Sequence, residues 1–282
     1  MGNVWDAMEK HEQEQPKKEG LPPKAESLKK EDSPGKAAAE VDITSSAPVL
    51  EKDSIACAGS NRYSPLLVVH HDRGSIFAEQ YRSLRTNMLS HSKQDCLCVA
   101  LTSAEAGEGK TITCLNLAMV LLELPGIRVI AIDGDMRKGT LSSLMNIGKS
   151  RGLADLLKGD CSLEEAIQPT SYPNLDVMPS GVIKRGEVGA ILGKFEKSGI
   201  ISKLRRQYDC VLVDTPAVGM ISDACVLSRV LDEVLLIVRM HKTNIGSVER
   251  TVGLLTTADI KISGMFLTHQ KDYVPTYFNR YY

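Results

Sequence analysis

From about residue 60 onward, the sequence predicts an α/β fold in which a mostly parallel β-sheet is covered by helices on both faces. Short apolar segments alternate there with longer segments that have helical spacing. The apolar segments are nearly continuous, as expected of strands that are buried on both faces. A chain of 282 residues with 43% hydrophobic residues can form one sizeable core.

The expected elements follow one another along this region of the chain. Apolar segments predict strands at Leu97–Leu101, Arg128–Ile132, Leu175–Met178, Cys210–Val213, Glu233–Val238 and Ile262–Leu267. Helical spacing is clearest at Ser75–Leu89, Lys110–Leu122, Phe195–Arg206 and Ile245–Thr257. Ligands of such sheets bind at the carboxyl ends of the strands, so functional residues are expected in the loops that follow them.

The first 60 residues have a different composition. The segment 9–36 is rich in proline and in charges of both signs. Such a segment cannot bury enough apolar area to offset its ordering entropy, so we expect a disordered linker up to about residue 60. Before it, Met1, Val4, Trp5 and Met8 share one face of a short helix, which is either a docking helix for a partner or a frayed terminus.

Composition excludes several classes of protein. The net charge of −1 gives no reason to expect a nucleic-acid partner. No apolar run reaches the ~18 residues of a spanning helix, and the N-terminus lacks the apolar region of a signal peptide. The seven cysteines form no C-x-x-C pair, which favours small buried core residues in a reducing compartment. These observations predict a cytoplasmic protein.

A phosphate-binding loop follows the first predicted strand and opens a helix. Residues 104–111 fit the P-loop pattern [A/G]-x-x-x-x-G-K-[S/T]. Gly107 and Gly109 allow backbone N–H groups to surround phosphate oxygens, Lys110 would reach the β- and γ-phosphates, and Thr111 would bind Mg²⁺. The alternative is an accidental glycine-rich turn. The predicted nucleotide-binding residues are Ala106, Gly107, Glu108, Gly109, Lys110, Thr111 and Ile112.

Three carboxylates lie at or just beyond the ends of two other predicted strands. Asp133 and Asp135 follow one apolar run, and Asp214 ends another. Each, taken alone, can be an ordinary strand-capping residue. Because neighbouring parallel strands end at one edge of the sheet, these carboxylates can together hold a metal beside the P-loop.

Several segments of the sequence resemble motifs of the bacterial tyrosine kinases of polysaccharide biosynthesis. The segment DGDMR, 133–137, resembles their second Walker motif, and VLVDTP, 211–216, resembles their Walker B motif. The phrases GLADLLKG and NLDVMPSG are also similar to this family. The resemblance runs from about Tyr63 to the C-terminus and implies an ATP-dependent protein-tyrosine autokinase that regulates exopolysaccharide or capsule synthesis and export.

The resemblance also implies roles for single residues. Lys110, Asp133, Asp135 and Arg137 would be catalytic, and Asp133 would accept or orient the tyrosine proton. Thr111, Asp135 and Asp214 would hold Mg²⁺. Exchanged roles for the two aspartates remain an alternative, as does a structural salt bridge for Arg137.

Partitioning-type P-loop ATPases are the nearest alternative class. Those proteins have an extra lysine near the start of the P-loop, where this chain has Glu105. A carboxylate there cannot act as the extra lysine and would repel the phosphates of a partner subunit, which disfavours this class. A non-catalytic nucleotide-binding regulator is a third possibility. Thr268 stands where relatives usually have Asn, which bears on adenine recognition.

A charged ridge lies on the helix that precedes the P-loop domain. Glu79, Arg82 and Arg85 are spaced as E-x-x-R-x-x-R on a helix that Ser75 caps. One interpretation is a solvated helix face with local ion pairs. The resemblance implies the other, a contact between subunits of a head-to-tail ring.

The C-terminal segment contains half of the eight tyrosines. The resemblance implies that Tyr273, Tyr277, Tyr281 and Tyr282 are autophosphorylation sites. The fifteen residues from Thr268 onward can extend ~50 Å at most, enough to reach a neighbouring subunit. We therefore expect an N-terminal helix and linker over residues 1–60, a kinase domain over residues 61–270 and a flexible tyrosine-rich tail over residues 271–282.

Partners are implied by the same resemblance. They are a separate membrane-embedded polysaccharide co-polymerase that activates the kinase and recruits it to the inner face of the plasma membrane, and a tyrosine phosphatase.

Overall fold

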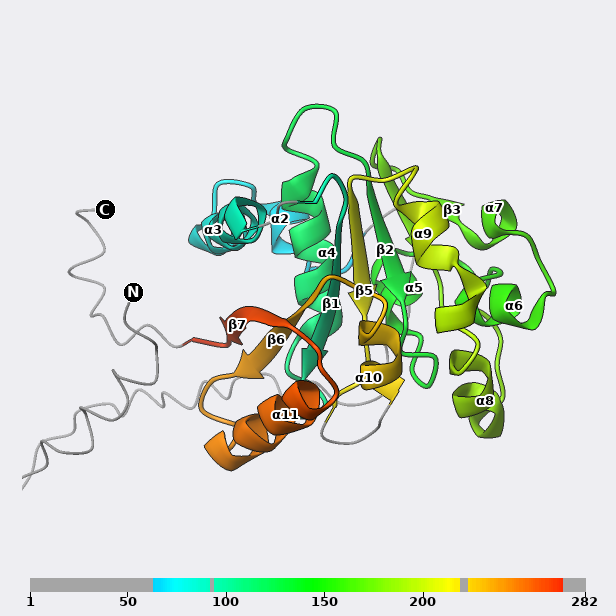
Figure 1. Ribbon diagram of the computed structural model, residues 1–282. Helices are drawn as coiled ribbons and strands as arrows, with labels where there is room; N and C mark the ends of the chain where they lie inside the picture. The colour runs from blue at the N-terminus through cyan, green and yellow to red at the C-terminus, as the bar shows by residue number, and fades with distance from the viewer. Residues whose placement is uncertain (1–62, 92–93, 219–222, 271–282) are drawn as a thin grey trace, which may run out of the picture. The chain divides into compact units, whose positions relative to one another are not determined.

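A computed structural model of the chain describes residues 63–91, 94–218 and 223–270 (Figure 1). All of them belong to one compact unit, Ala56–Tyr282. The predicted N-terminal helix and linker and the predicted tyrosine tail lie outside the described residues. The predicted boundaries of the three regions therefore stay predictions.

The core of this unit is a seven-stranded sheet with the strand order β3-β4-β2-β5-β1-β6-β7. The strands are β1 (Leu97–Ser103), β2 (Val129–Asp133), β3 (Gln168–Pro169), β4 (Leu175–Met178), β5 (Cys210–Asp214), β6 (Glu233–Arg239) and β7 (Ile262–Thr268). All neighbouring pairs are parallel except β3 and β4, which are antiparallel. The predicted mostly parallel α/β fold is confirmed, and the six predicted strands are present.

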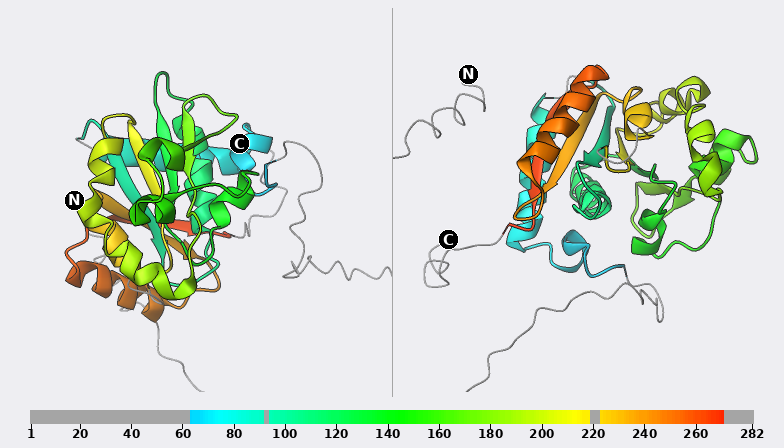
Figure 2. Two further views of the ribbon diagram at one scale, coloured as in Figure 1. Left: turned by 90° about the vertical axis from the view of Figure 1, so that its right-hand side faces the viewer. Right: turned by 90° about the horizontal axis from the view of Figure 1, so that it is seen from below.

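Helices cover both faces of the sheet, as predicted. One face carries α2 (Val68–His71), α3 (Ile76–His91), α4 (Lys110–Leu121) and α5 (Thr140–Leu144). The other carries α6 (Leu153–Lys158), α7 (Leu163–Ala166), α8 (Val188–Leu192), α9 (Ile200–Leu204), α10 (Asp223–Ser228) and α11 (Ile245–Thr257). In the right-hand view of Figure 2, the strands lie between α4 and α11.

One predicted helix is wrong in its extent. The sequence predicts a continuous helix over Phe195–Arg206, but this segment consists of a 3₁₀ turn, η2 (Glu196–Ser198), and the short helix α9. Gly199 separates them with a φ of +65°. This left-handed conformation interrupts the helical hydrogen bonding. A second 3₁₀ turn, η1 (Arg185–Glu187), precedes α8.

Helix α3 begins where the sequence predicts. The hydroxyl of Ser75 accepts a hydrogen bond from the backbone N–H of Ala78 at 3.2 Å, as an N-cap does. Tyr81, Leu84 and Met88 are buried against the sheet side of the unit. Most polar residues of α3 are exposed, whereas Arg82 and Arg85 are partly buried.

The described cysteines are all free, and four of the six are buried. Within the described residues, no helix is long and apolar enough to cross a membrane.

The register of the central strands brings the predicted functional residues together. β5 lies between β1 and β2, and the three strands run side by side in one direction (Figure 1). Asp133, the last residue of β2, pairs with Asp214, the last residue of β5. Asp214 also pairs with Leu101 of β1, just before the P-loop. The P-loop and both strand-end carboxylates thus lie at one edge of the sheet.

Candidate active site

The P-loop, residues 104–111, connects β1 to α4. Gly107 and Gly109 have φ values of +80° and +95°, which residues with a side chain rarely adopt. Within the described part of the chain, the backbone N–H groups of residues 106–109 have no hydrogen-bond acceptor. Four open N–H donors next to the start of a helix form a site suited to an anion such as phosphate.

Lys110 is the first residue of α4 and its side chain is buried. Its ammonium group donates a hydrogen bond to the hydroxyl of Ser103, with 2.9 Å between Nζ and Oγ. Burial lowers the pKa of Lys110, and the carboxylates of Asp214 and Asp135 oppose this shift. The amine is therefore held inside the loop at the end of β1.

Thr111 and Asp214 are in direct contact. The Thr111 hydroxyl donates a hydrogen bond to Oδ2 of Asp214 at 2.5 Å, and it also lies 3.3 Å from the hydroxyl of Thr140. Asp214 is 1% exposed, and its Oδ1 atom has no hydrogen-bond partner among the described residues. Burial raises the pKa of Asp214 to about 7, although Thr111 and Lys110 act in the opposite direction.

Asp133 is as deeply buried as Asp214. It is fully buried, its Oδ2 accepts the backbone N–H of Leu141 at 3.1 Å, and its Oδ1 has no partner within the described residues. Burial, and then the charge of Asp214, raise the pKa of Asp133 well above its usual range. Asp135 is also buried, and it completes the carboxylate edge, which we define as Asp133, Asp135 and Asp214.

Arg137 forms an ion pair with Asp223. Its guanidinium donates to Oδ2 of Asp223, the first residue of α10, at 2.9 Å from Nε and 2.8 Å from the terminal nitrogen. The structure therefore shows the salt bridge that the sequence left as one of two alternatives. The guanidinium remains one-third exposed.

A cavity of about 350 Å³ adjoins the P-loop on the side of β7. Gly109, Ile112 and Thr113 line it from the P-loop and α4. Apolar side chains of α3 and β7, including Phe77 and Phe266, form other walls. Thr268 also lines it, and its hydroxyl donates to the backbone carbonyl of Glu108 at 2.8 Å. This mostly apolar space is suited to a flat ring next to the phosphate site.

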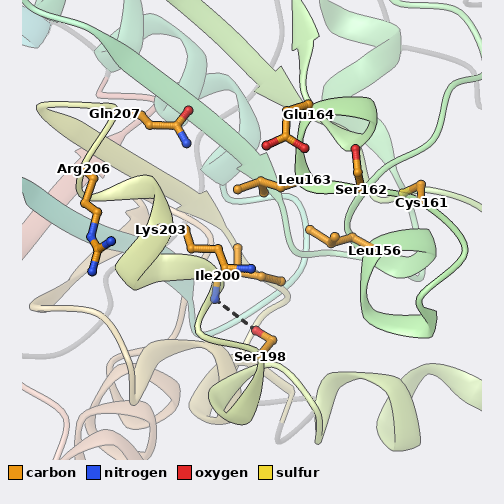
Figure 3. A pocket seen from close by; sticks show the side chains of 10 residues that line it. All are labelled: Leu156, Cys161, Ser162, Leu163, Glu164, Ser198, Ile200, Lys203, Arg206 and Gln207. Atoms are coloured by element: carbon orange, nitrogen blue, oxygen red, sulfur yellow. Dashed lines mark hydrogen bonds between the residues drawn. The ribbon is translucent and has the colours of Figure 1, made fainter.

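A larger cavity of about 620 Å³ lies elsewhere, between α9 and the segment from α6 to α7 (Figure 3). Lys203 and Ile200 line it from α9, and Leu156 and Glu164 line it from the opposite side. It contains no residue of the P-loop or of the carboxylate edge. Volume alone therefore does not identify the active site.

The residues predicted to hold Mg²⁺ do not form a complete protein cage. Among residues 63–91, 94–218 and 223–270, no three His, Cys, Asp or Glu side chains are close enough to hold a metal. Mg²⁺ is usually bound by one or two protein ligands together with water and phosphate oxygens. The Thr111 hydroxyl, the open Oδ1 of Asp214 and the neighbouring Asp135 fit a magnesium site of that kind.

The charged ridge is committed to contacts within the chain. Arg82 binds Glu123, beyond the end of α4, through two hydrogen bonds of 2.8 and 2.6 Å, and it binds Glu79 at 2.6 Å. Arg85 contacts Glu123 at 3.1 Å and the carbonyl of Val120 at 2.5 Å. The interpretation as local ion pairs thus describes these contacts. A role between subunits stays a prediction.

Three partners of the predicted residues were missed in the sequence. Ser103 holds Lys110, Thr140 lies beside Thr111, and Asp223 binds Arg137. Ser103 could have been found, since it is a polar residue at the end of a buried strand. Thr140 and Asp223 carry no such signal, because loops and helices of unpredicted geometry bring them to the site. The four predicted tyrosine sites lie outside the described residues.

Comparison with known proteins gives a consistent assignment. Residues 97–259 match a family described as an AAA domain. The chain is 32% identical to tyrosine-protein kinase YwqD of Bacillus subtilis over 198 residues, which are 70% of this chain and 83% of that protein. It is 29% identical to the putative tyrosine-protein kinase CapB of Staphylococcus aureus over 202 residues, which are 71% and 88% of the two chains.

Solved structures agree with the sequence comparison. The crystal structure of the chimerical protein CapA2B2 matches with a TM-score of 0.68 and 27% identity, over 74% of this chain and 92% of the other. The septum site-determining protein MinD of Pyrococcus horikoshii, complexed with Mg-ADP, matches less well, with a TM-score of 0.55 and 27% identity over 63% and 72%. The partitioning-type class is thus the more distant one. The chain belongs to the bacterial P-loop tyrosine kinases of capsule and exopolysaccharide synthesis.

Proposed function

We propose that the chain binds ATP with Mg²⁺ at the P-loop edge and transfers the γ-phosphoryl group to tyrosines of its own C-terminal segment. One observation carries this proposal. The ends of three adjacent strands bring a buried lysine, a threonine hydroxyl and two buried carboxylates into one site. Such a set can bind phosphates, hold their counter-ion and handle a proton.

The P-loop would bind the phosphates of ATP. The open N–H groups of residues 106–109 would donate to phosphate oxygens, and Lys110 would exchange its bond to Ser103 for a bond to the β- and γ-phosphates. The phosphates would pair the buried ammonium group with negative charge, which favours its charged form. The adjoining cavity lined by Ile112 and Thr268 would hold the adenine.

Thr111, Asp135 and Asp214 would hold Mg²⁺. Bound there, the cation would neutralise charge on the phosphates during transfer. A cation would also favour ionisation of Asp214, whose carboxyl group has a raised pKa because burial disfavours its charge.

Asp133 would accept the proton of the acceptor tyrosine. The phenol oxygen forms a bond to the γ-phosphorus, the bond between that phosphorus and the β–γ bridging oxygen breaks, and its electron pair leaves with ADP. The phenol proton passes to Oδ1 of Asp133, which has no other partner among the described residues. The raised pKa makes ionised Asp133 a stronger base than an ordinary aspartate.

The acceptor tyrosines would come from a neighbouring subunit. β7 lies next to β6 and runs parallel to it, so Gln270 leaves the sheet at the edge where the P-loop lies. The exposed carboxylate of Glu79 and the guanidinium groups of Arg82 and Arg85 would contact a second copy in a ring. A polysaccharide co-polymerase in the membrane would activate the kinase at the cytoplasmic face, and a tyrosine phosphatase would reverse the modification.

The test is an autophosphorylation assay with labelled ATP and Mg²⁺ on the full chain. Wild type is compared with Lys110→Met and with a chain truncated after Lys271, each with and without the co-polymerase. The proposal requires tyrosine labelling in wild type alone, with ATP binding retained after truncation. Release of phosphate without tyrosine labelling would instead identify a partitioning-type switch ATPase. ATP binding without either activity would identify a regulator.

A further inference from the structure

Glu108 places a negative charge in the middle of the phosphate-binding loop. Its side chain is 1% exposed, and it lies between the two glycines whose N–H groups would face phosphate. A carboxylate free to turn toward ATP would repel it, and the effect would be strong in a site of low dielectric constant. The role of the side chain therefore needs a separate explanation.

The carboxylate of Glu108 is fully engaged on the protein side. Oε2 accepts the backbone N–H of Glu105 at 2.8 Å. Oε1 accepts the backbone N–H of Arg239 at 3.3 Å and the hydroxyl of Thr243. Three donors thus fix the charge at the end of β6 and at the turn that leads to α11.

The backbone of the same segment is fastened to the next strand. The Thr268 hydroxyl, at the end of β7, donates to the carbonyl oxygen of Glu108 at 2.8 Å. The guanidinium of Arg239 donates to the carbonyl oxygen of Gly107 at 3.4 Å. We call these contacts of Gly107 and Glu108 with Glu105, Arg239, Thr243 and Thr268 the Glu108 clasp.

The clasp determines which groups of the loop remain open. It takes the N–H of Glu105 and two carbonyl oxygens of the loop, whereas the N–H groups of residues 106–109 have no acceptor in the described part of the chain. A loop held with its carbonyls bound and its N–H groups free needs little rearrangement to receive an anion. Preorganisation of this kind raises affinity by reducing the ordering that binding requires.

We propose that Glu108 is a positioning residue that holds the P-loop in its phosphate-binding conformation by fastening it to the ends of β6 and β7. The inference rests on the proposed function in assigning the anion to ATP. It adds that two elements outside the nucleotide motif, the β6–α11 turn and the end of β7, set the affinity for ATP.

Thr243 offers the sharpest test, since it lies outside the P-loop and the carboxylate edge. Thr243→Val removes one donor of the clasp and keeps the shape of the side chain, whereas Thr243→Ser keeps the hydroxyl. Thr251→Val is the matched control, because the Thr251 hydroxyl bonds only within α11, to the carbonyl of Ser247 at 2.8 Å. Glu108→Gln tests the carboxylate as acceptor. The amide keeps one acceptor oxygen but replaces the other with an NH₂ group, which would face a donor of the clasp.

Two measurements on the full chain are compared: calorimetric affinity for ATP with Mg²⁺, and kcat and KM for autophosphorylation. A hydrogen bond to a charged group justifies an expected loss of about tenfold in ATP affinity for Thr243→Val, with a matching rise in KM and kcat within about threefold. Thr243→Ser should remain within about twofold of wild type. Thermal unfolding of all variants separates this effect from a general loss of stability.

A purely structural brace predicts a different pattern. Thr243→Val and Thr251→Val would then lower the unfolding temperature alike and leave ATP affinity unchanged, which would overturn the inference. Absence of tyrosine labelling in wild type would contradict the proposed function alone, because the affinities for ATP would still report on the clasp.

Discussion

Two groups of charges in this domain lie at opposite ends of α4 and differ in how they are compensated. At the carboxylate edge, Asp133 and Asp214 are buried with one oxygen each left unpaired among the described residues, and burial raises the pKa of both carboxyl groups. At the charged ridge, the two arginines share a partner, Glu123, which lies beyond the end of α4 and is partly exposed. Hydrogen bonds from Arg82, more than any other interaction, lower the pKa of Glu123.

The opposite directions of these pKa shifts distinguish a ligand-binding site from a contact that stabilises the fold. A carboxylate with a lowered pKa is stabilised in its ionised form by the fold, so its contacts favour folding. A carboxylate with a raised pKa destabilises the fold when it is ionised. Such a group is retained where a ligand supplies the missing partner, and the carboxylate edge has this property.

The largest effect is expected for Asp133→Asn. Asparagine keeps the oxygen that accepts the N–H of Leu141, but it cannot take the phenol proton. Loss of a proton acceptor justifies a fall of about 100-fold or more in kcat for tyrosine phosphorylation. The affinity for ATP, measured by calorimetry, should change by less than about threefold.

Asp176→Asn is the matched control, because Asp176 lies in β4, away from the P-loop, and accepts a hydrogen bond from the hydroxyl of Tyr208. It should leave kcat near the wild-type value. Phosphorylation by Asp133→Asn at the wild-type rate would show that Asp133 does not handle the proton, and Asp135 would then be the next candidate.

A smaller effect, on stability, is expected for Asp214→Asn. Since the pKa of Asp214 in the folded chain is raised to about 7, the folded state binds a proton more tightly than the unfolded state does. Stability from this group is fully present below the unfolded pKa of about 4 and is lost as the pH rises toward 7. Between pH 6 and pH 8, wild type should lose about 1.4 kcal/mol relative to Asp214→Asn.

Urea unfolding of both proteins without nucleotide, at several pH values, measures this difference. A constant difference across pH 6–8 would show that Asp214 is ionised throughout and that burial does not control it. Addition of Mg²⁺ with ADP should stabilise wild type more than the variant at pH 8, because the cation pairs with the ionised carboxylate.

The fold was largely predictable because its signals are local. Strands buried on both faces leave continuous apolar runs, and Gly107, Gly109 and Lys110 fix the P-loop within a few residues. The break at Gly199 was missed because the apolar spacing continues through it on both sides. The two-residue strand β3 was missed because so short an antiparallel edge leaves no periodic pattern.

The candidate site was predictable in its charged residues but not in their partners. Strand ends identify Asp133 and Asp214, since parallel strands place their last residues together. By contrast, Arg239 and Thr243 lie 131 and 135 residues along the chain from Glu108, the carboxylate that they bind. Such contacts depend on how helices and turns pack, which no local pattern of the sequence determines.

The smallest effect is expected for Glu123, the shared partner of the two arginines in the charged ridge. Glu123→Gln removes the charge that Arg82 and Arg85 share, and ion pairs near the surface justify a loss of about 1 kcal/mol or less in the free energy of unfolding. The pKa of Glu123 is lowered, so its contribution is present at every pH above its unfolded pKa and is lost only as the pH falls through the folded value. Between pH 6 and pH 8 the difference between wild type and Glu123→Gln should therefore stay constant, whereas the difference for Asp214→Asn changes.

Urea unfolding at 0.1 and 1 M NaCl should show the contribution of Glu123 to stability shrinking with salt, because partly exposed ion pairs are screened. A difference that varies between pH 6 and pH 8 would remove the distinction between the two groups of charges.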